Sequence, residues 1–318
     1  MLLREPTMVL RDWTSDSRRW AEVPLRAGDI VVGTSPKCGT TWTQRIVGML
    51  LRQSPDPFPI QDDYPWIDMR MKPIEQVHEA LPRETQLTGR RSMKTHSPLD
   101  ALPLHDDVLY IHVTRDPRDA CMSWHNHVGG YTDVARAMMD HAGLNDESIG
   151  APCPPFIADP QAFFRAFLEQ PDYAPFTEFT IRTYCALGQG YWAQRQRPNV
   201  LLVHFNDLKA DLDGEMRRIA DFCGIAVDPA QWSQLVDAAD FAAMKRDGEA
   251  LMPTAAMAWV GGADRFLHKG TNQRWRDIVS IDDLAAYDAL AAAGMSPDLR
   301  RWSEQGRIAA GEPSSLAD

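Results

Sequence analysis

The sequence predicts an α/β fold, with a mostly parallel central sheet flanked by helices in a single domain. Short apolar runs typical of buried strands alternate with longer stretches of helical periodicity. The chain has 318 residues, of which 44% are hydrophobic, and this is enough for one substantial core. No linker rich in glycine, serine or proline and no internal repeat divides it. We therefore expect one domain over residues 1–318, with a loose polar tail at 309–318.

The first hundred residues predict two strands and a helix between them. An apolar run at 29–34 predicts the first strand, and an amphipathic pattern predicts a helix at 42–52. Residues 53–82 are rich in proline and aromatic residues, and predict loops around one short helix at about 74–80. The second strand is expected at 91–96, where a proline follows it closely.

The middle of the chain predicts the two remaining strands. Residues 108–114 are apolar enough to form a central strand of a parallel sheet. A helix is expected next, with Pro117 in its first turn, where proline is favoured. Residues 129–180 mix short helical patterns with proline and glycine and predict no definite element. The fourth strand is expected at 200–205.

The last third of the chain predicts mostly helix. A helix capped by Asn206-Asp207 is expected to run to about Phe222. Residues 246–270 lack periodicity and predict a long ordered loop, and an amphipathic helix is expected at 281–293.

Composition excludes several classes of function. The formal charge of −11 and a pI near 5.3 argue against general binding to nucleic acid or to an anionic membrane. Five scattered cysteines without a C-x-x-C or Cys/His cluster predict no metal site and fit a reducing, cytoplasmic location. No apolar run approaches the ~20 residues of a membrane span, so no integral membrane association is expected.

The stretch from Asp29 to Trp42 predicts an anion-binding loop. Its apolar run ends in a tight turn that contains Lys37, and Thr40-Thr41 lead into a helix. Backbone N–H groups in such a loop and at the helix N-terminus attract a phosphate or sulfate, and the lysine adds a full positive charge. A Gly-Thr-Thr turn can also simply cap a buried helix, so the loop by itself leaves both interpretations open.

The loop differs from the P-loop of ATPases, G-x-x-x-x-G-K-[ST], because its lysine precedes the last glycine. The frame Pro36-Lys37-x-Gly39-Thr40-Thr41-Trp42 resembles instead the 5′-phosphosulfate-binding loop of cytosolic-type sulfotransferases that use 3′-phosphoadenosine 5′-phosphosulfate (PAPS). Four later stretches resemble the same family in the same order: Lys94-Thr95-His96, Thr114-Arg115-Asp116-Pro117-Arg118-Asp119 with Ser123-Trp124, His204-Phe205-Asn206-Asp207-Leu208-Lys209, and Phe266-Leu267-His268-Lys269-Gly270 with Trp275 beyond it. The pattern is most similar to bacterial members such as glycolipid sulfotransferases.

This resemblance implies a set of catalytic and cofactor-binding residues. His96 would be the general base that takes the proton of the acceptor hydroxyl, Lys94 would bind the sulfuryl oxygens, and Lys37 would neutralise the bridging oxygen. The family's cofactor contacts fall on these residues: Lys37, Cys38, Gly39, Thr40, Thr41, Trp42, Arg115, Ser123, Phe205, His268, Lys269 and Gly270. PAPS would be the sulfuryl donor, and no metal is implied.

Several of these residues keep a second interpretation. Trp42 either stacks near the adenine or anchors the core beneath the loop. Cys38 either has a lowered pKa beside Lys37, so that its oxidation blocks the cofactor, or is a small residue that fits the turn. His268 stands where the family usually carries arginine, so either Arg274 supplies the missing charge or affinity for the 3′-phosphate is lower and pH-dependent.

The predicted reaction is in-line transfer of the sulfuryl group to a hydroxyl. The aromatic and methionine residues around the loops fit an apolar acceptor, such as a phenol, sterol, lipid or glycolipid, better than a polyanionic glycan. Two alternatives stay open at this point, a P-loop nucleotide kinase and a non-catalytic nucleotide-binding module on the same fold.

Overall fold

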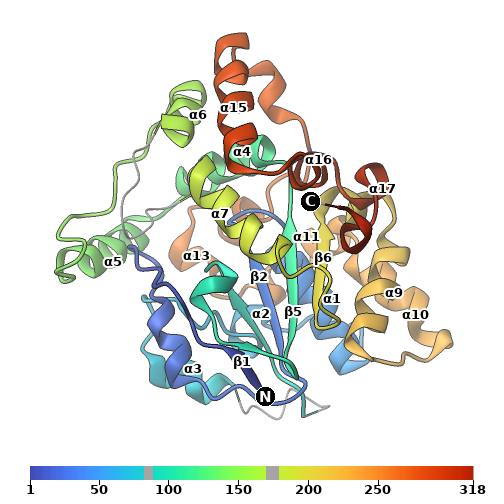
Figure 1. The fold of residues 1–318 in the computed structure, drawn as a ribbon. Coiled ribbons are helices and arrows are strands. Elements are labelled where there is room, and N and C mark those ends of the chain that lie inside the picture. The colour runs from blue at the N-terminus through green and yellow to red at the C-terminus, as the bar shows by residue number, and fades with distance from the viewer. Residues whose placement is uncertain (82–88, 170–178, 318) are drawn as a thin grey trace.

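A four-stranded parallel sheet forms the centre of the fold (Figure 1). The computed structural model describes residues 1–81, 89–169 and 179–317. The strands lie in the order β3 (Ser92–Thr95), β2 (Ile30–Thr34), β5 (Leu109–Thr114) and β6 (Val200–His204), and every neighbouring pair is parallel. The predicted fold class is thereby confirmed. Because the strands are parallel, their C-terminal ends meet at one edge of the sheet, which is where ligands bind in such folds.

The other elements surround this sheet. A small antiparallel pair consists of β1 (Leu2–Arg4) and β4 (Leu104–His105). The longer helices are α1 (Thr40–Arg52), α4 (Pro117–Val128), α5 (Asp133–Leu144), α6 (Pro160–Glu169), α7 (Ile181–Trp192), α9 (Leu212–Cys223), α10 (Pro229–Ala239), α15 (Ile281–Gly294) and α16 (Pro297–Gln305). The shorter ones are α2 (Ile60–Asp63), α3 (Ile74–Ala80), α8 (Phe205–Ala210), α11 (Phe241–Arg246), α12 (Gly248–Leu251), α13 (Ala255–Ala258), α14 (Gly262–Phe266) and α17 (Arg307–Ala310), with 3-10 turns at Ser17–Glu22, Leu99–Ala101, Arg274–Asp277 and Pro313–Ser315.

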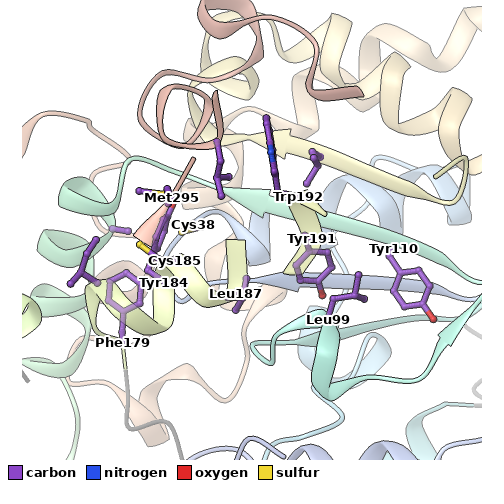
Figure 2. Close-up of a cluster of buried hydrophobic side chains, with 14 of the residues drawn as sticks. Cys38, Leu99, Tyr110, Phe179, Tyr184, Cys185, Leu187, Tyr191, Trp192 and Met295 are labelled. Carbon is purple, nitrogen blue, oxygen red and sulfur yellow. The ribbon is translucent and has the colours of Figure 1, made fainter. Parts of the chain in front are cut away.

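Both faces of the sheet are covered by apolar side chains. Val31 packs into a cluster with residues of α7, α15 and α16, part of which Figure 2 shows. Its neighbours Ile30 and Val32 point to the opposite face, into a cluster with α1, α9 and α10. Successive residues of a strand face opposite sides, so a strand covered on both sides must be apolar throughout. This explains why β2, β5 and β6 were visible in the sequence as apolar runs, whereas β3 contains Ser92, Lys94 and Thr95.

One expected helix is broken in two. The side chain of His204 accepts a hydrogen bond from the Asn206 N–H, so α8 begins at Phe205 and the predicted cap at Asn206-Asp207 is wrong. Asp211 has φ −146° and ψ 75°, which ends α8, and its carboxylate then accepts from the Gly214 N–H at the start of α9. A short polar side chain that bonds the backbone locally competes with helix continuation in this way.

The predicted loop at 246–270 is also wrong, because it contains α12, α13 and α14. Each has only four or five residues, so none repeats an apolar pattern often enough to be visible in the sequence. The helices expected at about 74–80 and 281–293 are present as α3 and α15. Residues 129–180, which predicted no definite element, contain α5 and α6, although 170–178 lie outside the described residues.

Near the C-terminus, the Arg195 guanidinium donates hydrogen bonds to the carbonyls of Pro313 and Leu316. The loose tail at 309–318 stays a prediction. Among the helices that the structure describes, none has an apolar stretch long enough to cross a bilayer.

Replacing Gly33 with alanine should destabilise the fold. Gly33 lies in β2, where an added Cβ would sit 1.8 Å from the hydroxyl oxygen of the buried Tyr191. We expect Gly33→Ala to lower the free energy of unfolding by roughly 1–3 kcal/mol, because neither the strand nor α7 can move apart cheaply. Gly188→Ala is the control. It lies in α7 with nothing within 4 Å of an added Cβ, and should stabilise the helix by about 0.5–1 kcal/mol. Urea unfolding would measure both, and equal stabilities would contradict the prediction.

Candidate active site

A cavity of about 460 Å³ opens where the strands of the parallel sheet end. The residues that directly follow β3, β5 and β6 are His96, Arg115 and Phe205, and all three line it. Most of the residues expected at the site from the sequence meet here: Lys37, Gly39, Thr40, Thr41, Trp42, Lys94, His96, Arg115, Ser123, Phe205, His268, Lys269 and Gly270. The exception is Cys38.

The loop after β2 turns through two left-handed residues. Lys37 has φ 63° and Gly39 has φ 109°, and α1 begins immediately after at Thr40. A Cβ at position 39 would also lie 3.2 Å from the ring of Phe205, so this position favours glycine for both backbone and space. No side chain caps α1. Its first N–H groups are therefore free to bind an anion at the positive end of the helix.

Three cations lie in this cavity without a paired carboxylate. Lys94 and Arg115 are only 7% and 5% exposed, and Lys37 is partly buried. None of the three forms a salt bridge with any residue in the described part of the chain. Burial, together with the charges of Lys94 and Arg115, lowers the pKa of Lys37 to about 7, and burial lowers the pKa of Lys94 to about 8. Unpaired buried charge is costly, so this cluster fits an anionic ligand.

One ring nitrogen of His96 forms a hydrogen bond to the backbone, and the other has no partner in the described structure. Its Nδ1 lies 2.8 Å from the carbonyl oxygen of Thr34, and because a carbonyl only accepts, Nδ1 carries the hydrogen. The lone pair is therefore on Nε2. Burial and the nearby positive charge of Lys94 hold the pKa of His96 well below its usual range, so the imidazole is neutral. A neutral histidine on the cavity wall with a free Nε2 can take a proton from a hydroxyl.

Asp68 accepts hydrogen bonds from the two neighbours of His96 in the chain. The hydroxyl of Thr95 donates to Asp68 Oδ2 over 2.7 Å, and the hydroxyl of Ser97 donates to the same oxygen. The residues on either side of His96 are thus bound to one buried carboxylate. Asp68 also follows closely on Trp66, whose ring lies edge-on to His96 at 4.9 Å between centroids and 4.4 Å from the Lys94 Nζ. Sequence reasoning missed Asp68, because no local pattern links it to a strand 24 residues later.

Arg115 and Phe205 line the cavity where β5 and β6 end. The Arg115 guanidinium lies 4.4 Å from the centroid of Phe205 and donates to the Thr271 carbonyl and the Asn272 side chain. Its buried Nε has no partner in the described structure. Trp42 meets the edge of Phe205 at 5.4 Å and donates its indole N–H to the Ala239 carbonyl. Trp42 therefore anchors α1 to α10 as well as lining the cavity.

In the stretch from Phe266 to Trp275, Arg274 carries positive charge at the cavity and His268 does not. Burial and the charges of Arg274 and Lys269 lower the pKa of His268 to about 4, so the His268 ring is neutral. Arg274 lies 3.4 Å from its Nδ1 and lines the cavity. The geometry thus favours Arg274 as the source of the charge that His268 lacks. Gly270 has φ 59°, and a Cβ there would approach the Phe241 ring to 2.9 Å.

The Cys38 thiol points away from the cavity. It belongs to the buried cluster of Figure 2, and burial raises its pKa to about 12. The interpretation of Cys38 as a thiol with a lowered pKa is therefore wrong. Proximity to Lys37 and a helix N-terminus would favour the thiolate, but desolvation outweighs them.

The other half of the cavity is apolar. Residues from several distant segments form this wall: Leu10, Met69, Met71, Trp124, Tyr131, Val134, Met138, Met139, Phe179, Leu187, Met257, Trp259 and Phe266. The sequence also suggests an apolar pocket mouth formed by Tyr64, Trp66, His125, His127, Tyr131 and the Met- and Trp-bearing stretch 244–260. Trp66, His127, Tyr131 and parts of 244–260 line the cavity, whereas Tyr64 and His125 do not. The sequence carried no signal for α5 or for the N-terminal segment.

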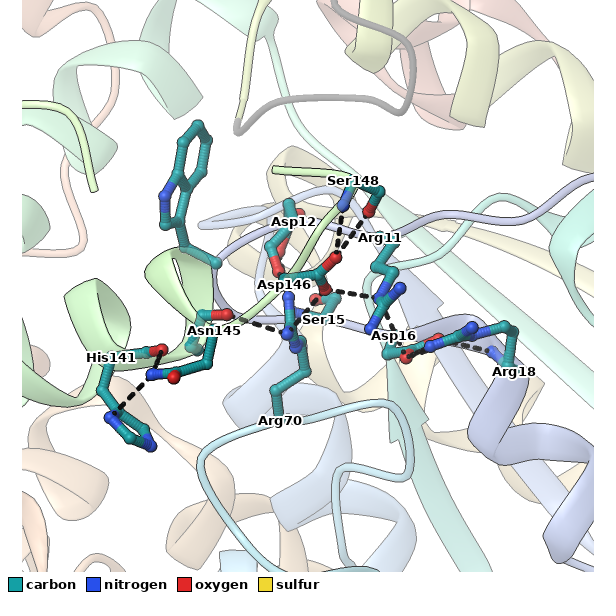
Figure 3. Close-up of polar contacts among 12 residues, drawn as sticks. Arg11, Asp12, Ser15, Asp16, Arg18, Arg70, His141, Asn145, Asp146 and Ser148 are labelled. Atoms are coloured by element: carbon teal, nitrogen blue, oxygen red, sulfur yellow. Dashed lines mark hydrogen bonds and ion pairs between the residues drawn. The ribbon is translucent and has the colours of Figure 1, made fainter. Parts of the chain in front are cut away.

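A buried ionic cluster holds three parts of this apolar wall together (Figure 3). The Asp146 carboxylate is fully buried and forms ion pairs with Arg11 at 2.6 Å and with Arg70 at 2.8 Å. Arg70 also donates to the carbonyls of Asp12 and Ala142. The cluster thereby joins the N-terminal segment, the loop after α2 and the end of α5, each of which supplies side chains to the cavity.

The chain matches a family model and curated relatives over most of its length. The model, described as a sulfotransferase domain, matches residues 27–297. A glycolipid sulfotransferase of Mycobacterium tuberculosis is 33% identical over 315 residues, which cover 94% of this chain and 95% of the relative. The luciferin sulfotransferase of Photinus pyralis is 24% identical over 292 residues, covering 83% and 70%.

Solved structures share the fold. Retinol dehydratase, in complex with androsterone and the inactive cofactor PAP, superposes with a TM-score of 0.64 at 21% identity, covering 89% of this chain and 87% of that one. A mouse sulfotransferase in complex with PAP gives a TM-score of 0.60 at 17% identity, covering 89% and 91%.

Replacing the buried Lys94 with methionine should stabilise the protein at neutral pH. The pKa of Lys94 is about 8 in the folded protein, against 10.5 for a free lysine. Below pH 8 the folded state therefore holds a charge that it disfavours, and this cost shrinks as the pH rises toward 10.5. We expect Lys94→Met to gain roughly 1–3 kcal/mol at pH 7 and progressively less above pH 8. Lys245→Met, at an exposed position, should change stability by less than about 0.5 kcal/mol. A gain that grows with pH would contradict the assignment.

Proposed function

The chain belongs to the sulfotransferase domain family, and we propose that it transfers the sulfuryl group of PAPS to a hydroxyl group of an apolar acceptor. The observation that carries this proposal is the cluster of Lys37, Lys94 and Arg115, three cations in one cavity with no carboxylate paired to them in the described structure. A donor with a 5′-phosphosulfate and a 3′-phosphate would supply the missing negative charge at both ends of the cluster.

The loop and the first turn of α1 would hold the 5′ end of the donor. The N–H groups of Gly39, Thr40 and Thr41 lie at the unpaired positive end of this helix. The 3′-phosphate would lie against Arg115 and Ser123, with Arg274 and Lys269 beside them. When bound, PAPS supplies an activated sulfuryl group with a good leaving group, and the adenine would lie against Trp42 and Phe205, whose rings meet edge to face.

Three side chains would act at the point of transfer. His96 accepts the proton of the acceptor hydroxyl at Nε2, because its Nδ1–H is held by the Thr34 carbonyl. Lys94 neutralises the oxygens of the transferring group, and Lys37 neutralises the bridging oxygen as its bond to sulfur breaks. Burial leaves both lysines poorly solvated, which lowers their pKa values and strengthens the interaction of their charged forms with a developing negative charge.

The acceptor is proposed to be apolar around its reacting hydroxyl. The wall formed by α5, α7 and the α13–α14 segment is rich in methionine and aromatic residues. Such a surface fits a phenol, sterol, lipid or glycolipid. The glycolipid sulfotransferase relative and the androsterone complex of the related fold support this class of acceptor. We place the enzyme in the cytoplasm as part of the same proposal.

Binding of 3′-phosphoadenosine 5′-phosphate (PAP), the desulfated product, should stabilise the protein selectively. At 100 times its Kd, PAP should add about 2.7 kcal/mol to the free energy of unfolding, measured by thermal shift without added metal. AMP should add much less, because it lacks the 3′-phosphate that Arg115 would bind. Stabilisation by ATP with magnesium but not by PAP would support the kinase alternative instead.

Replacing His96 with alanine should separate chemistry from binding. Loss of the base should lower kcat by about 10²-fold or more, whereas the Kd for PAP should change less than about threefold, because His96 faces the acceptor. His105→Ala, on β4 away from the cavity, is the matched control. A variant that binds PAP normally and turns over at the wild-type rate would refute the role of His96. Wild-type protein that binds PAP but shows no transfer to any acceptor would support the non-catalytic alternative.

A further inference from the structure

A second histidine lies directly against Lys37. The Nδ1 of His127, on α4, is 3.2 Å from the Lys37 Nζ, although 90 residues separate the two in the chain. His127 lines the cavity and is only 8% exposed. The roles derived above for the site do not use it.

The His127 ring is held by aromatic neighbours on several sides. Its centroid lies 5.0 Å from the nearly parallel ring of Trp124, and 4.8 to 5.4 Å from the rings of three further residues: Tyr131, Trp259 and Phe266. Phe266 also contacts Lys37, whose Nζ is 4.2 Å from its ring centroid. The imidazole can therefore rotate little, and its Nδ1 stays directed at the lysine.

The contact defines which nitrogen of His127 carries the hydrogen. Burial and the charges of Lys37 and Lys94 hold the pKa of His127 well below its usual range, so the ring is neutral. An ammonium group only donates, so Nδ1 must accept from Lys37 and the hydrogen sits on Nε2. This is the opposite tautomer to that of His96. The Nε2–H of His127 has no acceptor among the residues that the structure describes.

We propose that His127 is a positioning residue that holds the Lys37 ammonium in the donor site through its Nδ1. The inference rests on the proposed function of Lys37, because it concerns how that lysine is prepared. Lys37 has a left-handed backbone and a long flexible side chain, and no other described residue accepts a hydrogen bond from its Nζ. His127 removes the freedom that the ammonium would otherwise lose when the donor binds.

His127 also favours the charged form of Lys37. The other ionisable groups around this pair are Lys94, Arg115, His96, Arg265 and Cys38, and Lys94 and Arg115 among them repel the ammonium. A neutral imidazole that accepts a hydrogen bond acts against this repulsion without adding negative charge. A carboxylate there would hold the ammonium more strongly, but it would repel the anionic donor.

The pH dependence of PAP affinity tests this role by calorimetry. Wild-type affinity should fall above pH 7, as Lys37 in the free protein loses its proton. His127→Phe keeps a ring among the aromatic neighbours but removes the acceptor, so the fall should begin at a lower pH. At pH 7.5 the variant should bind PAP about three- to tenfold more weakly than wild type, and at pH 5.5 by a smaller factor, because only the positioning of the charged ammonium is then lost.

His127→Asn should restore the wild-type profile, because its amide oxygen can take the place of Nδ1. The difference between wild type and His127→Phe should vanish when Lys37→Met is added to both proteins. His125→Phe, on the same helix but outside the cavity, should match wild type. Identical profiles for wild type and His127→Phe would overturn the inference while leaving PAP binding, and thus the proposed function, intact.

A spectroscopic test needs neither cofactor nor turnover. Long-range ¹H–¹⁵N spectra of the unliganded protein at pH 6 should show a neutral Nε2–H tautomer that disappears in His127→Asn. A neutral Nδ1–H tautomer should disappear in His96→Ala. A His127 ring that is protonated, or that carries its hydrogen on Nδ1, would contradict the proposed contact with Lys37.

Discussion

The site depends on placing three cations in a poorly solvated cavity without giving them carboxylate partners. Lys94 lies near the end of β3, and Lys37 and Arg115 lie in the loops that follow β2 and β5, so the parallel sheet brings the three together. Each would be more stable beside an aspartate. Instead they meet aromatic rings, backbone carbonyls and a neutral histidine, which hold the charges in place without cancelling them. Such a cavity lowers the stability of the folded protein and is suited to bind an anion.

Neutral histidines take a consistent part in this arrangement. His96, His127 and His268 all have a pKa held below its usual range, because burial and the neighbouring cations disfavour a further positive charge. Each then offers an unprotonated nitrogen, His127 to Lys37 and His268 to Arg274, while His96 keeps its own for the cavity. The same electrostatic field thus sets the protonation state of the proposed base and of the residues around it.

The two halves of the cavity are built by different means. The half of the cavity that holds the cations follows the regular geometry of the sheet, since Lys37, His96 and Arg115 lie in the loops directly after β2, β3 and β5. The apolar half is assembled from segments that include the N-terminal segment, the loop after α2, α5 and the α13–α14 segment. Two of these are tied to the N-terminal segment by the Asp146 cluster of Figure 3. This separation lets the apolar wall differ in shape without moving Lys37, Lys94 or His96.

The sequence by itself determined the strands, the loop with Lys37, and the Lys94-Thr95-His96 and Arg115 motifs, because each lies within a few residues and carries a local pattern. It did not predict the break at Asp211 or the short helices of residues 246–270, where local polar caps and single turns replace periodicity. Only the tertiary structure decided the partners of those motifs. Asp68 behind His96, His127 against Lys37 and the raised pKa of the Cys38 thiol all result from packing between distant segments. Burial and neighbouring charge depend on the whole fold, so the same residue in the same motif can be a ligand or a core side chain.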